Sequence, residues 1–172
     1  IINASPIADM TSLLLALNAD LVINGKQIKV IKLKDFYTGY KTMKFQKGEI
    51  LDEIRVDLPK KGALFNFEKI SRRTYLDIAS VNSSLYLEVN EKLISNVHIS
   101  AGGVAPIPLY LEKTIEYLIG KEISFDVIKH AAEIALQEIK PISDARGSAE
   151  YKSLLFRNLI FAHFEKFFPN LV

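Results

Sequence analysis

The sequence predicts an α+β fold built from two consecutive parts, and three observations support this prediction. Turn-forming residues at 59–62 interrupt the chain. Beyond this break, apolar residues alternate at strand spacing between residues 85 and 101. Helical periodicity then continues from about residue 108 onward. Strands followed by helices are typical of α+β folds, so we expect one unit at 1–60 and a second at 61–172.

The first unit is expected to contain one helix and several strands. Ser5 followed by Pro6 is a helix-start signal, because the serine hydroxyl can accept a free backbone N–H and proline loses no hydrogen bond at the first helical position. We therefore expect a helix over 5–17. Asn24-Gly25 predicts a type I′ hairpin turn. The strands expected around and after this turn lie at 21–23, 27–33 and 50–58.

The second unit is expected to form an antiparallel meander followed by helices. Its expected strands lie at about 63–70, from about 77, at 85–89 and at 97–101, and Gly102-Gly103 closes the meander. Its expected helices lie at about 108–119, 125–139 and 148–168. Gly120 suits the end of the first helix, and Pro141 would stop the second. In the last helix we expect Tyr151 and Leu154 to face the core and Lys152 to face solvent.

Composition and charge exclude several classes of function. The 22 Lys and Arg residues nearly balance the 20 Asp and Glu residues and leave a net charge of +2, so no basic surface suited to nucleic acid or an anionic membrane is predicted. The sequence contains no cysteine, which rules out disulfides, iron–sulfur clusters and thiolate zinc sites within it. No apolar run reaches the length of a membrane span. We expect a cytoplasmic protein that binds neither nucleic acid nor membrane.

Motifs of several common active sites are absent from the sequence. Neither G-x-G-x-x-G nor G-x-x-x-x-G-K occurs, so neither a Rossmann turn nor a P-loop is predicted. His98, His130 and His163 lie far apart without the spacing of metal ligands. We expect these histidines to be structural or exposed, and we predict no metal site. No serine is placed beside a base in a way that predicts a nucleophile.

Two charged stretches, 4–9 and 67–79, stand out from the rest of the chain. Asp9 falls in the first turn of the expected first helix, where the helix dipole would stabilise its carboxylate by about 0.3–1 kcal/mol. Lys69, Arg72 and Arg73 form a charge run at the end of an expected strand. Taken alone, these residues indicate only a helix-terminal carboxylate and a solvated basic run.

The combination and order of six segments resembles a known family. The segments are NASPIAD at 3–9, DFYTGYKT at 35–42, KGEIL at 47–51, KISRRTYLDIASVN at 69–82, SAGGVAPIP at 100–108 and PISDARGSAEYK at 141–152. Together they resemble the FAD-binding subunit of the molybdenum hydroxylases, which include xanthine dehydrogenase and carbon monoxide dehydrogenase. Within this family, the sequence resembles in particular the FAD subunits of bacterial xanthine dehydrogenases.

This resemblance implies a more detailed fold. Residues 1–60 would be the end of a PCMH-type FAD-binding domain. Residues 61–172 would form a three-stranded antiparallel sheet with a three-helix bundle, as in the C-terminal domain of the CO dehydrogenase flavoprotein. In this family an upstream half of the FAD domain holds the FAD pyrophosphate. We therefore expect FAD to be shared between this chain and that upstream half.

The resemblance also implies candidate FAD-binding residues. Ser5 and Asp9 belong to the S-P-x-x-D segment, whose aspartate faces the polar part of FAD. Leu51 matches a position that lines the isoalloxazine. Lys69 is the nearest match to a lysine beside the pyrimidine end of the flavin. Lys41 stands where many relatives carry arginine, so a bidentate contact is not expected there.

The segment before the last helix is expected to have a packing role rather than direct contact with flavin. Asp144 and Arg146 could form a local ion pair, and Ser148 could cap the helix. The phenylalanines of the last helix are expected in the core and at a subunit interface. They are Phe156, Phe161, Phe164, Phe167 and Phe168.

The function implied by the resemblance is electron transfer in an oxidoreductase. Electrons from a molybdopterin centre would pass through iron–sulfur clusters on partner domains or subunits, reach FAD, and leave to NAD or another acceptor. The isolated chain is expected to be inactive. Two alternatives stay open: a non-catalytic assembly module of the complex, or the flavin subunit of a relative that oxidises carbon monoxide, nicotinate or an aromatic CoA ester.

Overall fold

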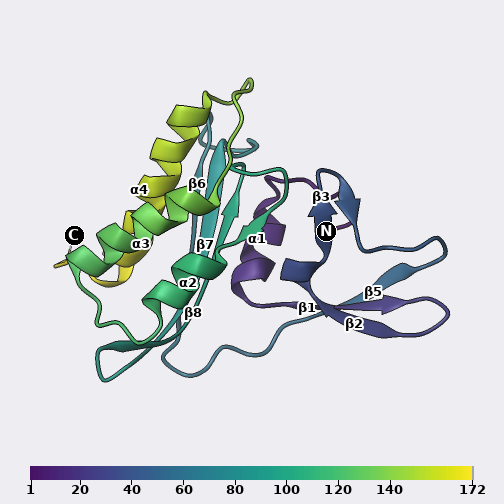
Figure 1. The fold of residues 1–172 in the computed structure, drawn as a ribbon, viewed down its shortest axis with the longest axis horizontal. Helices are drawn as coiled ribbons and strands as arrows, with labels where there is room; N and C mark the ends of the chain where they lie inside the picture. The colour runs from purple at the N-terminus through teal and green to yellow at the C-terminus, as the bar shows by residue number, and fades with distance from the viewer. Residues whose placement is uncertain (172) are drawn as a thin grey trace.

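A short helix and a set of antiparallel hairpins form the first unit of the computed structural model, which describes residues 1–171 (Figure 1). Its elements are α1 (Asp9–Ala16), β1 (Asp20–Asn24), β2 (Lys29–Lys32), η1 (Leu33–Asp35), β3 (Tyr37–Gly39), β4 (Thr42–Met43) and β5 (Ile50–Arg55). β1 lies between β2 and β5 in an antiparallel sheet, and β3 pairs with β4. Leu21, Ile23 and Phe36 belong to a hydrophobic core within this unit.

The first helix begins at Asp9, so the prediction of a helix from residue 5 with Ser5 as its N-cap is wrong. The N-cap position is Ala8, and no side chain caps this helix. The reason is tertiary: the carbonyl of Pro6 accepts the Gly103 N–H at 2.9 Å, and the carbonyl of Ile7 accepts the Asn82 side-chain amide at 3.1 Å. These backbone groups therefore pair with the second unit instead of starting a helix.

The hairpin predicted around Asn24-Gly25 is confirmed, but the type I′ turn is not. β1 and β2 pair up to Ile23 and Lys29, so the loop is longer than two residues. Gly25 is also not among the glycines with positive φ. A Cβ atom at Gly25 would lie 2.8 Å from Cγ of Glu49, so close approach of that side chain favours glycine here.

The second unit is a four-stranded antiparallel sheet with three helices. Its elements are β6 (Leu64–Ile70), β7 (Val81–Asn90), β8 (Leu93–Gly102), β9 (Leu109–Tyr110), α2 (Glu112–Leu118), α3 (Phe125–Glu138) and α4 (Ala149–Phe167). The strand order is β6-β7-β8-β9. The expected helix at 108–119 starts only at Glu112, because Leu109 and Tyr110 pair with β8 as a fourth strand. The α+β prediction is confirmed, and β9 adds a fourth strand to the three that the resemblance implied. The strand expected from about residue 77 begins only at Val81 and forms one strand, β7, with the one expected at 85–89.

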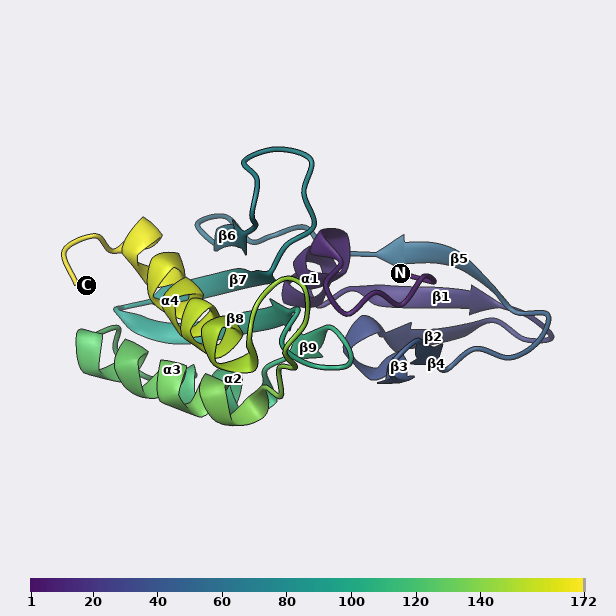
Figure 2. The same cartoon turned by 90° about the horizontal axis from the view of Figure 1, so that it is seen from above.

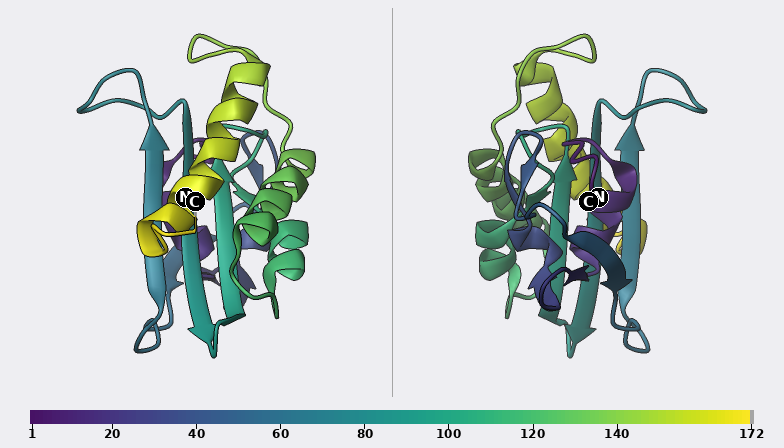
Figure 3. Two further views of the ribbon diagram at one scale, coloured as in Figure 1. Left: turned by 90° about the vertical axis from the view of Figure 1, so that its left-hand side faces the viewer. Right: turned by 90° about the vertical axis from the view of Figure 1, so that its right-hand side faces the viewer.

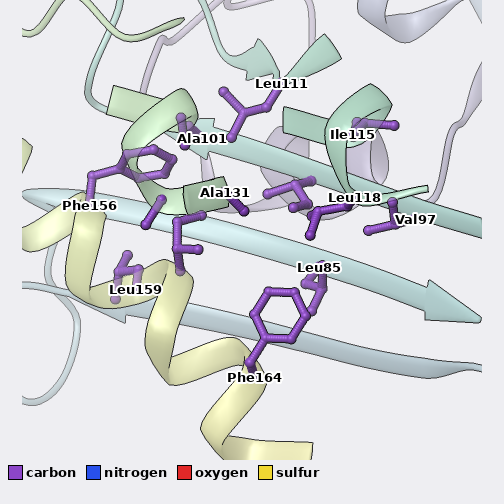
Figure 4. Close-up of a cluster of buried hydrophobic side chains, with 14 of the residues drawn as sticks. Leu85, Val97, Ala101, Leu111, Ile115, Leu118, Ala131, Phe156, Leu159 and Phe164 are labelled. Atoms are coloured by element: carbon purple, nitrogen blue, oxygen red, sulfur yellow. The ribbon is translucent and has the colours of Figure 1, made fainter. Parts of the chain in front are cut away.

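The two faces of this sheet differ in chemistry, and strand alternation explains why. Leu85, Leu87 and Ile99 point to one face. The helices α2, α3 and α4 cover this face of the sheet (Figure 3). Figure 4 shows side chains of α4, including Phe156 and Phe164, within this core. The residues that alternate with them along the strands, such as Asn82, Ser84 and Ser100, point to the opposite face, against which α1 packs. A polar surface thus joins the two units, and it includes a hydrogen bond of 2.8 Å between the Ser12 and Ser100 hydroxyls.

The last helix is rotated relative to the prediction. Lys152 is buried, with 2% of its surface exposed, whereas Tyr151 and Leu154 are 47% and 54% exposed. The helix turns Phe156 and Phe164 into the core, which confirms that part of the aromatic prediction, and this orientation carries Lys152 inward. A basic side chain is tolerated there because it has an acidic partner, described below.

A linker connects the units after β5. Gly62 has a φ of +88°, and the Ala63 N–H donates to the Lys60 carbonyl at 3.0 Å, which forms the turn that the sequence predicted. Seen from above, the molecule is elongated, with the β1, β2 and β5 sheet at one end, α1 in the middle, and α2, α3 and α4 toward the other end (Figure 2). None of the helices within residues 1–171 is both long and apolar enough to cross a membrane.

Gly103 provides a test of how the two units are joined. Its φ is +83°, and a Cβ atom would lie 2.6 Å from the Ser80 carbonyl oxygen and 2.9 Å from Cδ1 of Ile7. Gly103→Ala is expected to lower the free energy of unfolding by about 2 kcal/mol or more, through left-handed backbone strain and overpacking. Urea denaturation measures this change.

Gly120→Ala is the matched control, because Gly120 has a φ of +77° but nothing lies within 4 Å of an added Cβ. It carries the backbone strain without the clash, so we expect it to cost less than Gly103→Ala. If both variants lose the same free energy of unfolding, the close contacts with Ile7 and Ser80 are not the reason that residue 103 is glycine.

Candidate functional site

A pocket of about 710 Å³ lies where the two units meet. Its first wall consists of residues 5–9, and Tyr40 and Lys41 from the β3-β4 turn border it. Residues 77–79, before β7, contribute a second side. The opposite wall comes from the segments after β8 and α3, including Lys140, Ile142 and Arg146. The pocket therefore brings together five of the six sequence segments that carry the family resemblance, all except 47–51.

Asp9 is held by hydrogen bonds to both of its carboxylate oxygens. Oδ2 accepts from the Lys69 ammonium at 2.7 Å, and Oδ1 accepts from the Asn82 amide at 2.7 Å. Lys69 donates a second hydrogen bond of 2.7 Å to the carbonyl of Asp77. The Asp9 side chain is 38% exposed. Its orientation is thus fixed while part of the carboxylate faces the pocket, an arrangement that could accept a hydrogen bond from a ligand.

The groups that hold Asp9 lie in one row across the sheet. In the strand register, Lys69 on β6 is opposite Asn82 on β7, and Asn82 is opposite Gly102 on β8. Neighbouring residues in such a row point to the same face of a sheet. That face is the one covered by α1, so the first turn of α1 brings Asp9 directly onto this row.

The opposite wall is held by an ion pair with a buried lysine. The Lys152 ammonium lies 2.8 Å from Oδ2 of Asp144 and also donates to the Ile142 carbonyl at 2.9 Å. Partial burial acts to raise the pKa of Asp144, but the Lys152 ammonium and the Arg146 backbone N–H outweigh it and hold that pKa below its usual value. Asp144 thus pairs with Lys152, and not with the Arg146 side chain that the sequence suggested. Ser148 caps α4, as predicted, by accepting the Tyr151 N–H at 3.1 Å.

The segment between β6 and β7 projects from the sheet and reaches the pocket at Asp77 (Figure 2). Arg73 is exposed, as expected of a solvated charge run, and its guanidinium lies 3.4 Å from the Asp77 carboxylate. The Arg73 backbone N–H is the main cause of a lowered pKa at Asp77. Tyr75 and Leu76 in the same segment are 82% and 99% exposed.

The four candidate residues named from the sequence are only partly brought together. Ser5 and Asp9 line the pocket. Lys69 lies one contact behind the wall, bonded to Asp9. Leu51 is on β5, packed against the core of the first unit, and is not among the residues lining the pocket. Lys41 lines the pocket, and its ammonium donates to the Asn3 carbonyl at 2.7 Å.

Sequence reasoning missed the roles of Asn82 and Lys152. Asn82 ends a segment that carries the resemblance, but nothing in the local pattern marks its side chain as a partner of Asp9. Lys152 looked like a solvent-facing residue because helical periodicity alone did not locate the buried face. Both roles depend on which distant segments meet.

The histidines take structural or exposed positions, as predicted. Burial lowers the pKa of His163 to about 3, and its Nδ1 lies 3.0 Å from the Asn66 amide. His98 is bonded to the Tyr110 hydroxyl, and His130 lies on the exposed side of α3. Within the described residues, no group of acidic and histidine side chains is arranged to hold a metal ion.

Comparison with known proteins assigns the chain to a family. Residues 66–167 match the family described as the CO dehydrogenase flavoprotein C-terminal domain, and residues 1–60 match the FAD binding domain in molybdopterin dehydrogenase. The chain therefore belongs to the family of FAD-binding subunits of molybdenum hydroxylases, which confirms the resemblance inferred from the sequence.

Individual relatives differ in the substrate that their names specify. The chain is 31% identical to the glyceraldehyde dehydrogenase medium chain of Sulfolobus acidocaldarius, over 95% of this chain and 58% of that protein. It is also 31% identical to xanthine dehydrogenase 1 of Arabidopsis thaliana, over 98% of this chain and 13% of that protein. In the solved structure of reconstituted CO dehydrogenase from Oligotropha carboxidovorans, the matching chain superposes with a TM-score of 0.87 at 26% identity, covering 92% of this chain and 56% of that one. This chain thus spans little more than half the length of the medium-chain relatives.

Proposed function

We propose that this chain supplies one wall of the FAD site in a molybdenum hydroxylase and that the remainder of its subunit supplies the rest. The observation that carries this proposal is the Asp9 carboxylate, fixed through both oxygens and partly exposed to the pocket. If Asp9 served only to stabilise the start of α1, it would not need two side-chain partners from the second unit. The matched family of residues 1–60, described as FAD-binding, supports the same conclusion.

The residues of the pocket fit part of a flavin. A volume of about 710 Å³ lies in the usual range for ligand sites, about 300–1,000 Å³. Tyr40, Ile78 and Ile142 give the lining apolar surface suited to a flat ring system. Asp9 could accept a hydrogen bond from an N–H or O–H group of the cofactor, and the Ser5 hydroxyl could donate one.

The chemistry that FAD supplies when bound is the acceptance of electrons from iron–sulfur clusters on a partner and their delivery to NAD or another acceptor. This chain contributes orientation and electrostatics. Asp9 orients the polar edge of the ring, and Lys69 places a cation directly behind that carboxylate. The apolar lining excludes water from the ring.

The wider setting belongs to the same proposal. The partners are an upstream half of the FAD domain and subunits that carry the iron–sulfur clusters and molybdopterin, and the complex is cytoplasmic. The substrate is oxidised on another subunit, which agrees with the range of substrates among relatives of similar identity. Xanthine is one candidate, and carbon monoxide, an aldehyde, nicotinate and an aromatic CoA ester are others. The isolated chain is expected to be inactive.

Lys69→Met tests whether the Asp9–Lys69 pair lies beside the flavin. The substitution removes a cation near the ring, so it should disfavour the reduced, more negative flavin and lower the midpoint potential. Because Asp9 offsets part of the lysine charge, we expect a shift on the order of 30 mV, or about 1.4 kcal/mol for a two-electron couple. Spectroscopic redox titration of the complete subunit measures it.

Lys129→Met is the control, because Lys129 is an exposed lysine of α3 and does not line the pocket. Its midpoint potential should match that of the wild type. If Lys69→Met leaves the midpoint potential of the flavin unchanged, Lys69 does not lie near the flavin.

A further inference from the structure

We propose that Asn82 is a positioning residue for Asp9, and that residue 102 is glycine because the Asn82 side chain occupies the space above it. The inference rests on the proposed FAD site, since its consequence is the placement of a carboxylate that binds the cofactor. It concerns the sheet of the second unit, where Asn82 and Gly102 pair across β7 and β8.

The hydrogen bonds of Asn82 fix the orientation of its amide. The side chain is fully buried, and its Nδ2 donates to Oδ1 of Asp9 at 2.7 Å and to the Ile7 carbonyl at 3.1 Å. Both partners are acceptors only, so the amide nitrogen and not the oxygen must face them. Ile7 and Asp9 both line the pocket. A single side chain from the second unit therefore holds a carboxylate and a backbone segment of the pocket wall.

This orientation leaves a polar atom without a partner. Oδ1 of Asn82 is buried and has no hydrogen-bond partner among residues 1–171. Unpaired buried acceptors are destabilising and uncommon in native structures. An apolar side chain of similar size would fill the same space without this cost. The contact with Asp9 is the feature that an apolar side chain could not reproduce.

Gly102 is required by Asn82 and not by its own backbone. A Cβ atom at residue 102 would lie 2.1 Å from Oδ1 and 2.9 Å from Cγ of Asn82. Gly102 is not among the glycines with positive φ, so its backbone would accept alanine. Gly102→Ala should therefore displace the Asn82 side chain, and with it Asp9, to which Asn82 is hydrogen-bonded.

The test compares Asn82→Ser, Gly102→Ala and the double variant in the complete subunit. FAD dissociation constants are measured by fluorescence titration, and the free energy of unfolding is measured in parallel. Each single variant is expected to weaken FAD binding about tenfold, because each removes the hydrogen bond that holds the Asp9 carboxylate in place for the cofactor. The double variant should bind FAD about as weakly as either single variant, because both changes break the same contact.

Asn96→Ser is the matched control on the same sheet. Asn96 donates to Glu88 at 3.1 Å, and it does not line the pocket around Asp9. This variant should keep the wild-type affinity for FAD even if it lowers stability. A merely structural role of Asn82 would likewise lower stability and leave the affinity of the folded protein unchanged.

Asp9→Ala separates failure of this inference from failure of the proposed function. In an Asp9→Ala background, Asn82→Ser should cause no further loss of FAD affinity. If Asp9→Ala weakens binding but neither Asn82→Ser nor Gly102→Ala does, the positioning role is wrong and the FAD site stands. If Asp9→Ala itself leaves binding unchanged, the FAD site proposed here is wrong. Gly102→Ala provides the same test by a second route should Asn82→Ser not fold.

Discussion

Lys152→Met is expected to lower the free energy of unfolding by about 2–4 kcal/mol, because it removes one partner of an ion pair at a buried position. This loss of stability is smaller than for a fully buried ion pair, because the Asp144 side chain is 35% exposed and water can partly solvate it once Lys152 is removed. The Ile142 carbonyl loses its hydrogen bond in the same variant. Urea denaturation measures the change.

The pH dependence of this loss identifies its origin. The pKa of Asp144 is lowered in the folded state, so the pair stabilises the fold above the ordinary aspartate pKa of about 3.9. This contribution is lost as the pH falls through the lowered value. The difference in stability between wild type and Lys152→Met should therefore narrow in acid.

Lys166→Met, at an exposed position of the same helix, should change stability by only a few tenths of a kcal/mol, as surface substitutions usually do. A loss of the same size at both lysines would mean that the contacts of Lys152 do not stabilise this wall.

Asp9→Ala is expected to weaken FAD binding by the complete subunit about 10- to 100-fold, equal to about 1.4–2.8 kcal/mol. The carboxylate provides a charged hydrogen-bond acceptor at the pocket, and its loss also leaves Lys69 and Asn82 without their shared partner. The stability of the protein should fall less, because Lys69 keeps the Asp77 carbonyl and Asn82 keeps the Ile7 carbonyl as acceptors. Removal of a carboxylate from a helix start itself costs only about 0.3–1 kcal/mol. Titration with FAD and urea denaturation give the two values.

Asp126→Ala separates a flavin contact from a helix-terminal effect. Asp126 occupies the first turn of α3, as Asp9 does in α1, and it does not line the pocket. We expect Asp126→Ala to lower stability slightly and to leave FAD binding unchanged. Matching losses of stability and of FAD affinity at Asp9 would favour the simpler role of a carboxylate at a helix start.

The order of strands and helices in the second unit followed from the sequence because its signals are local. Alternation at Leu85 and Leu87 and the cap at Ser148 each involve neighbouring residues. The prediction of where α1 begins was wrong because the carbonyls of Pro6 and Ile7 accept hydrogen bonds from the second unit. No window around Ser5 contains that information.

The candidate site shows the same division between local and distant causes. Ser5 and Asp9 were found through a segment that carries the resemblance, and the structure places both at the pocket. The Asp9–Lys69 contact spans 60 residues of sequence, and the Asp9–Asn82 contact spans 73. Contacts between residues so far apart in the sequence can be predicted only when the register of the sheet is known.

The visible absorption spectrum tests the central claim most directly. The chain is mixed with FAD, alone and together with the upstream half of its subunit, and each mixture is desalted before the spectrum is recorded. Size-exclusion chromatography confirms that the two halves have associated. We expect a flavin spectrum to be retained only when both halves are present. An associated pair that retains no flavin would contradict the FAD site proposed here and would favour a role for this chain in assembly.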